Sequence, residues 1–112
     1  MSHVFVLGVT NKDDDLNYVM DEIAGTVFDY WDPVKADTVV DGVALGAIKT
    51  VQDAYDAGVD KLCKVCIGIC VPYRIYDDPM NLYTPEQLQI LFEKVLDYWQ
   101  TDDQCRVFDV HI

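Results

Sequence analysis

The chain has 112 residues, 51% of them hydrophobic and 25% charged, and its 20 acidic and 8 basic residues give a formal net charge of −12. This composition excludes intrinsic disorder, which combines high charge with low hydrophobicity. The length fits a single acidic domain, residues 1–112, with its own hydrophobic core.

Charge and hydropathy also indicate which partners to expect. Lysine and arginine supply most of the affinity of proteins for nucleic-acid phosphates, so the chain is not expected to bind nucleic acid directly. It has no run of 18 apolar residues and no basic, then apolar, secretory signal at its start. An acidic protein is also repelled by anionic membrane surfaces. We therefore expect a cytoplasmic protein that does not bind membranes.

The negative charge is concentrated in the first half of the chain. Residues 1–60 carry 12 acids and 3 bases, whereas residues 61–112 carry 8 acids and 5 bases. The segment from Asp13 to Asp32 contains seven acids and no base. This asymmetry is the most unusual feature of the sequence.

The first half of the chain predicts one strand and two helices. Residues 3–9 are apolar on both alternating faces, which is typical of a buried strand. Apolar residues then recur at helical spacing from Leu16, predicting a helix that ends near Trp31, before Pro33. A second helix is predicted at 38–57, although the β-branched residues at its start also allow a short strand at 38–41.

The second half predicts a strand, a helix and a terminal strand. Residues 61–75 alternate apolar side chains on one face without a polar interruption. Thr84-Pro85-Glu86-Gln87 has the form of a capping box that starts a helix, and Cys105–Ile112 alternates as a strand. The order β-α-α-β-α-β predicts an α/β domain with a three-stranded, mainly parallel sheet flanked by helices.

The four cysteines and two histidines do not have the spacing of a metal site. On an extended strand Cys66 and Cys70 share a face roughly 13 Å apart, too far for one ion, and Cys63 points away from both. We therefore expect no metal and no cofactor, and we assign Cys63, Cys66, Cys70 and Cys105 to the core as free thiols. His3 and His111 are expected at strand ends, where they could meet Asp109 only if the terminal strands were antiparallel neighbours.

One alternative function uses carboxylates at an edge of the sheet. Asp13 and Asp15 follow the first strand, and Asp77 follows the strand at 61–75. If these strands are parallel neighbours, the three carboxylates lie together at the carboxyl edge and could hold Mg²⁺ for phosphate chemistry. The competing interpretation is that these aspartates only cap helices and close turns.

The preferred interpretation is a binding protein rather than an enzyme. Unneutralised carboxylates repel one another, so a concentrated acidic face suggests a use, such as steering onto a basic protein surface. Basic surfaces of that size belong mostly to nucleases and other nucleic-acid-binding proteins. We therefore expect an inhibitor that mimics nucleic acid, a device used by anti-restriction, anti-CRISPR and nuclease-immunity proteins of phages and mobile elements. Its expected contact residues are Asp13, Asp14, Asp15, Tyr18, Asp21, Glu22, Asp29, Tyr30 and Asp32.

A third interpretation is a subunit of a larger assembly or a homodimer. It rests on Ile90, an apolar residue on the polar side of the last predicted helix.

Overall fold

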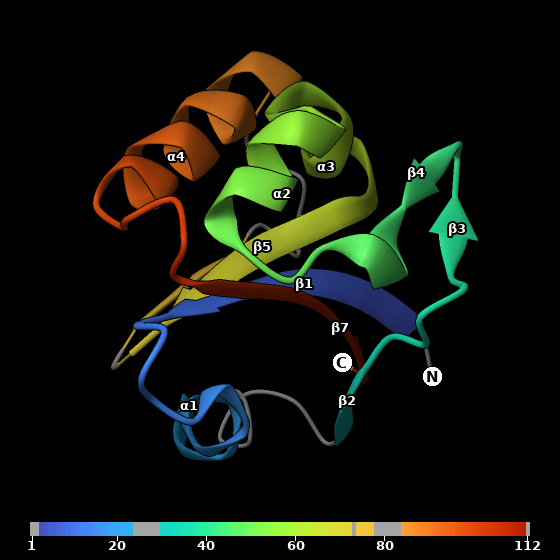
Figure 1. The fold of residues 1–112 in the computed structure, drawn as a ribbon. Helices are drawn as coiled ribbons and strands as arrows, with labels where there is room; N and C mark the ends of the chain where they lie inside the picture. The colour runs from blue at the N-terminus through green and yellow to red at the C-terminus, as the bar shows by residue number, and fades with distance from the viewer. Residues whose placement is uncertain (1–2, 24–29, 73, 78–83, 112) are drawn as a thin grey trace.

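The computed structural model describes residues 3–23, 30–72, 74–77 and 84–111 of the chain. Figure 1 shows the helices and strands that these residues form. In chain order they are β1 His3–Thr10, α1 Leu16–Ile23, β2 Tyr30–Pro33, β3 Val39–Val40, β4 Val43–Ala44, a 3-10 helix Leu45–Ala47, α2 Val51–Ala57, α3 Val59–Val65, β5 Cys66–Val71, β6 Arg74–Asp77, α4 Pro85–Asp97 and β7 Gln104–His111.

Five of the strands form one mixed sheet in the order β2-β7-β1-β5-β6. β1 and β5 are parallel, whereas the pairs β1–β7, β2–β7 and β5–β6 are antiparallel. The predicted α/β class is confirmed, but the predicted three-stranded, mainly parallel sheet is wrong. The reason is the β5–β6 hairpin, which reverses the chain once before α4. The helical connection through α4 therefore brings β7 back antiparallel to β1.

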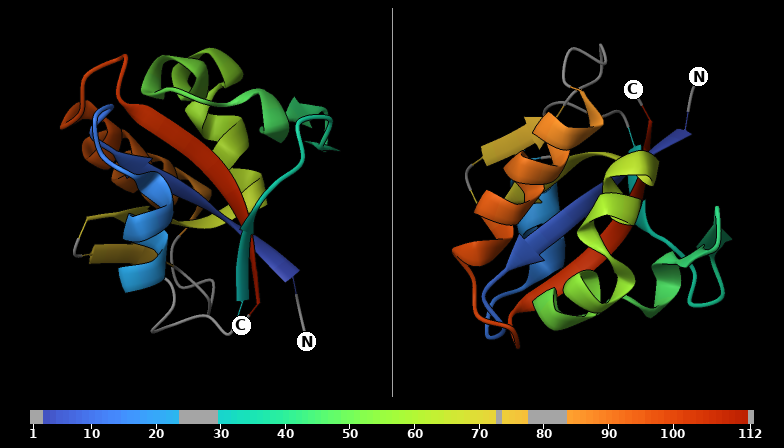
Figure 2. Two further views of the ribbon diagram at one scale, coloured as in Figure 1. Left: turned by 60° about the horizontal axis from the view of Figure 1, so that its bottom comes forward. Right: turned by 90° about the horizontal axis from the view of Figure 1, so that it is seen from above.

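Helices cover both faces of the sheet. α1 lies on one face, and α2, α3 and α4 lie together on the other (Figures 1 and 2). Side chains of the central strand β1 alternate between two cores: Val6 packs with Met20 of α1, whereas Leu7 and Val9 pack with the other three helices. Burial on both faces explains why residues 3–9 form an apolar run, and the predicted strand is confirmed.

The first helix is shorter than the sequence predicted. α1 ends at Ile23, residues 24–29 lie outside the described residues, and Tyr30–Pro33 forms the edge strand β2 instead of the end of a helix. Aromatic residues favour strands, and an edge strand tolerates proline because one side of it needs no hydrogen-bond partner.

The predicted helix at 38–57 is only half helical. Its start is a hairpin of β3 and β4 joined by Asp41 and Gly42, which both have positive φ (51° and 79°). This turn geometry suits a two-residue hairpin and agrees with the alternative of a short strand at 38–41. The 3-10 helix and α2 follow. The predicted end at residue 57 is confirmed, and Gly58 follows it with φ 96°.

The predicted strand at 61–75 is wrong at both ends, because β5 covers only Cys66–Val71 and the chain then turns back into β6 at Arg74. Residues up to Val65 belong to α3, and the strand begins at Cys66. An apolar run at Val59, Leu62 and Cys63 suits the buried side of a helix as well as a strand, so its period alone does not decide between them. Tertiary packing against α4 selects the helix.

The last helix and the terminal strand are confirmed. Thr84 caps α4 by accepting a hydrogen bond from the Gln87 N–H, while the Gln87 side chain accepts one from the Thr84 N–H. α4 has 13 residues, and no helix within the described ranges is long and apolar enough to cross a membrane.

Candidate functional site

The acidic loop between β1 and α1 is held by residues from the far end of the chain. The Asp103 carboxylate, 4% exposed, accepts hydrogen bonds from the backbone N–H groups of Lys12 (3.0 Å) and Gln100 (2.8 Å). The Lys12 Nζ lies 2.8 Å from the Asp102 carboxylate. This ion pair raises the pKa of Lys12 and lowers the pKa of Asp102. The loop therefore has two separate anchors beside the start of β7.

Gln104 supplies a third anchor for the same loop. Its side-chain amide donates to the carbonyl oxygens of Asn11 (3.0 Å) and Lys12 (3.2 Å), and also to that of Asp14. The Asn11 carbonyl also accepts the Asp14 N–H inside the loop, so the Gln104 side chain attaches an already turned loop to β7.

Asp15 is the residue that caps α1. Its carboxylate accepts the N–H of Asn17 at 3.0 Å, and its carbonyl accepts the N–H of Val19. For Asp15, the interpretation that these aspartates cap helices is thus confirmed. Its carboxylate is exposed but already has a structural use.

The outward side of α1 carries acids around an exposed tyrosine. Asp21 and Glu22 are exposed, and Tyr18, which is 59% exposed, donates a hydrogen bond from its hydroxyl to Glu22 at 2.6 Å. On the opposite side Leu16, Val19 and Met20 are buried against the sheet. Together with the exposed loop acids, this side forms what we term the acidic α1 surface, which consists of Asp13, Asp14, Asp15, Tyr18, Asp21 and Glu22.

Among the described residues, no base forms a salt bridge with the acidic α1 surface, although Lys12 interacts electrostatically with the neighbouring Asp13. The Lys12–Asp102 pair is the only salt bridge formed between described residues, and it involves none of these acids. Carboxylates left unpaired on one side of a short helix repel one another and favour a cationic partner.

Two of the expected contact residues lie on the other face of the sheet. Tyr30 and Asp32 flank Trp31, whose side chain packs in the core beneath α1, and successive side chains of a strand point to opposite faces. The Tyr30 ring packs against the His111 ring, with centroids 4.7 Å apart and ring planes inclined by 46°. Partial burial and the Asp32 carboxylate raise the pKa of Tyr30. The structure therefore does not join Tyr30 and Asp32 to the acidic α1 surface.

The terminal strands place three further polar residues near this second group. β1 and β7 are antiparallel neighbours, so His3 pairs with His111, and Asp109 lies opposite Asp32 on β2. β1 and β7 are thus the antiparallel neighbours that bring the two histidines together, as one of the two sequence-based alternatives required. Among the described residues no group of three or more His, Cys, Asp or Glu side chains could hold a metal ion. Asp29, also among the expected contacts, lies outside the described residues.

The aspartates expected to bind Mg²⁺ do not converge along the backbone. β1 and β5 are parallel neighbours, as that interpretation required. However, the hairpin turns β6 back, and Asp77 pairs with Gly68, which is level with Val6 in the middle of β1. Asp13 and Asp15 lie beyond the end of β1, so Asp77 is not beside them.

The four cysteines are buried and form no disulfide, as predicted, but their placement differs from the prediction. A shift in the β1–β5 register after Cys66 places Cys66 and Cys70 in different cores, and Cys63 lies on α3 rather than on a strand. Burial raises the pKa of Cys63 to about 12 and also raises those of Cys66 and Cys105.

Two exposed apolar residues lie on α4 and directly after its last residue, Asp97. Ile90 is 52% exposed, in agreement with its predicted position, and Tyr98 is 81% exposed beside Trp99. Self-association through α4 stays a prediction, which light scattering of the purified chain tests.

Comparisons of the chain with protein-family models, with curated proteins and with solved structures find no match in any of the three. A functional argument therefore rests on the residues of this chain alone.

Proposed function

We propose that the chain is an acidic binding protein that inhibits a nucleic-acid-handling protein by covering its basic surface. The observation that carries this proposal is the acidic α1 surface, where exposed carboxylates that form no salt bridge with any described residue surround the exposed Tyr18 ring. Tyr30 and Asp32, on the other face of the sheet, are left out of this contact surface.

The arrangement suits fast binding of a cationic partner. Carboxylates on one side of a helix produce a local negative potential that attracts a basic surface from a distance. Tyrosine is a common anchor in interfaces because its ring adds apolar contact area and its hydroxyl can hydrogen bond. The three anchors of the preceding loop keep these groups in place before a partner arrives, which lowers the entropy lost on binding.

A pair of charge-matched variants tests the proposal. Asp21→Asn with Glu22→Gln removes two charges from the acidic α1 surface, and the amide oxygen of the new glutamine side chain can still accept the Tyr18 hydrogen bond. Asp37→Asn with Asp41→Asn removes two exposed charges elsewhere, and asparagine tolerates the positive φ at position 41. Any difference between the two variants therefore reflects the position of the charge.

The binding experiment captures basic nucleic-acid-binding proteins from an extract of the source cells and then uses one purified captured protein. We expect the wild-type chain and the Asp37/Asp41 variant to displace DNA from this protein. The Asp21/Glu22 variant should bind about tenfold more weakly. Association should slow sharply between low and physiological salt. Equal binding by both variants, or an association rate insensitive to salt, contradicts the proposal.

A further inference from the structure

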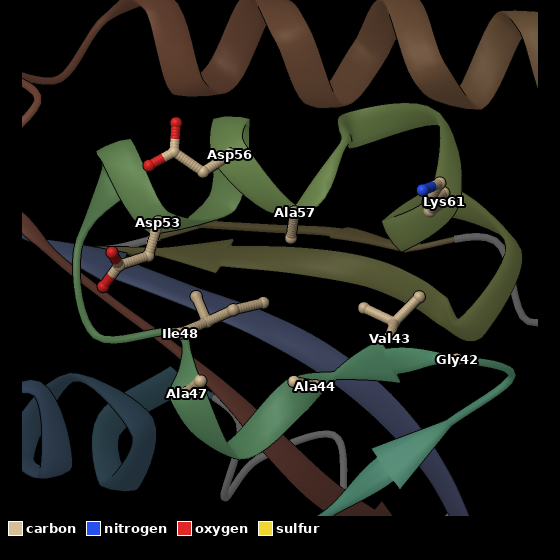
Figure 3. Close-up of a pocket in the computed structure, with 9 residues that line it drawn as sticks. All are labelled: Gly42, Val43, Ala44, Ala47, Ile48, Asp53, Asp56, Ala57 and Lys61. Atoms are coloured by element: carbon tan, nitrogen blue, oxygen red, sulfur yellow. The ribbon is translucent and has the colours of Figure 1, made fainter.

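A cavity of about 300 Å³ lies between the β3–β4 region and the helices α2 and α3 (Figure 3). Its apolar lining includes Ala44, Ala47, Ile48 and Ala57. The small side chains of the three alanines leave the space open, and Ile48, 2% exposed, belongs to the larger core. This volume is at the lower end of the range for small-molecule sites.

Charged groups of opposite sign line the two ends of this cavity. Asp53 and Asp56 lie toward one end, and Lys61 lies toward the other, with Ile48 and Ala57 between them; the Asp56 carboxylate points away from Ile48 (Figure 3). Lys61 is exposed, and it forms no salt bridge with any described residue. The cavity thus has an acidic end, an apolar middle and a basic end.

The acidic end is held in a defined position by the capping box of α2. Asp53 Oδ2 accepts the backbone N–H groups of Lys49 (3.0 Å) and Thr50 (3.1 Å). Within the described residues its Oδ1 makes no hydrogen bond, so this oxygen can accept one from a ligand. Asp56 Oδ1 accepts the Gln52 side-chain amide at 2.9 Å, which orients the second carboxylate.

We propose that this cavity binds a small zwitterion, a molecule with an ammonium group and a carboxylate separated by a short hydrocarbon chain. The ammonium group contacts Asp53 Oδ1, with the Asp56 carboxylate adding negative charge at the same end, the carboxylate contacts Lys61, and the hydrocarbon lies against the apolar middle. The cavity is on the α2–α3 face of the sheet, opposite α1, so this proposal is independent of the inhibitor function.

Ligands with one charge match the cavity less well. A simple cation would leave Lys61 unpaired at the far end, and a simple anion would meet two carboxylates in a chain of net charge −12. An uncharged ligand would pair with none of the three groups. Only opposite charges at the two ends complement the whole lining, and unpaired charges are a common source of discrimination between ligands.

The test compares 6-aminohexanoate, which carries both charges, with hexanoate, which has only the carboxylate, and hexylamine, which has only the ammonium group. Binding is followed by amide chemical shifts in NMR at ligand concentrations up to about 10 mM, a range that includes weak small-molecule affinities. We expect 6-aminohexanoate to shift the amides of Ala47 and Ala57 and to bind about tenfold more tightly than either single-charge probe.

Two pairs of variants locate the binding. Lys61→Gln should weaken 6-aminohexanoate about tenfold, whereas Lys64→Gln, at an exposed lysine further along α3 and outside the cavity, should not. Asp56→Asn should weaken it more than Asp60→Asn. The proposal is overturned if the three probes bind alike, if none shifts these amides, or if each pair of variants behaves identically.

Discussion

The Asp103 carboxylate accepts a hydrogen bond from the backbone N–H of Lys12, 91 residues earlier in the chain, at 3.0 Å. This contact, together with the Gln104 side chain, attaches the acidic loop to the strand that follows α4. The acids that dominate the first half of the sequence are therefore positioned by residues close to its C-terminal end.

Replacing Asp103 by alanine should destabilise the fold and loosen the acidic loop. The substitution leaves the N–H groups of Lys12 and Gln100 without their acceptor, and unsatisfied polar groups in a part-buried site cost about 2 kcal/mol in the free energy of unfolding. Urea unfolding measures the loss, and hydrogen exchange of the Lys12 amide measures the loosening. Asp102→Ala is the control, because its ion pair with Lys12 is exposed and screened by solvent, so its loss should affect the free energy of unfolding little. Equal losses for the two variants would contradict the role of Asp103.

Gly46→Ala should destabilise the region between β2 and α2. A Cβ at position 46 would lie 2.1 Å from the carbonyl oxygen of Lys35, which is backbone and cannot rotate away. Such overpacking costs about 1–3 kcal/mol, measured by urea unfolding. Gly42→Asn is the comparison: a Cβ there meets nothing within 4 Å, and asparagine tolerates positive φ, so we expect a smaller loss. A smaller effect at Gly46 than at Gly42 would disprove this explanation.

The buried thiols should be unreactive in the folded chain. Burial hides the four cysteines and raises the pKa values of Cys63, Cys66 and Cys105, which lowers the thiolate fraction at neutral pH. A thiol-specific disulfide reagent should therefore label the native chain slowly, Cys63 first because it is 8% exposed, and label all four rapidly in urea. Rapid labelling of Cys66 or Cys105 without denaturant would show that the core is more open than described.

The contact between Tyr55 and Asp97 should make stability depend on alkaline pH. Partial burial, then the hydrogen bond from the Tyr55 hydroxyl to the Asp97 carboxylate, raises the pKa of Tyr55 to about 12 from an ordinary value of about 10. Because the folded-state pKa is the higher one, this contribution is complete below pH 10 and is lost as the pH rises through 12. The difference in unfolding free energy between wild type and Tyr55→Phe measures it.

We therefore expect that difference to be constant below about pH 10 and to shrink above it. Asp97→Asn should lower the Tyr55 pKa, which is read from tyrosinate absorbance. If the difference in unfolding free energy between wild type and Tyr55→Phe instead grew above about pH 10, the folded-state pKa of Tyr55 would be the lower one, and this explanation would be wrong.

Local signals in the sequence predicted those elements whose stabilising contacts are also local. The capping box at Thr84 and Gln87 lies within four residues, and the strand at 3–9 is apolar because both of its faces are buried, whichever strands flank it. The acidity of the Asp13–Glu22 segment was equally readable, since charge does not depend on folding.

The cavity near Lys61 could not be predicted, because it forms between a hairpin and two helices that were themselves predicted as one long helix followed by a strand. Its lining of Ala44, Ala47 and Ala57 has no local signature, since small residues at these positions are equally common in ordinary helices.

By itself, the sequence determined the α/β class, the acidic character of the first half, the capped last helix and the burial of the cysteines without disulfides. Only the tertiary structure decided strand direction, the boundary between α3 and β5, and which acids share a surface. The physical reason is that each of these depends on contacts between distant segments: the β5–β6 hairpin reverses β7, and edge pairing of β2 with β7 sends Tyr30 and Asp32 to the face opposite Tyr18. Periodicity records which residues are buried, but not the partner that buries them.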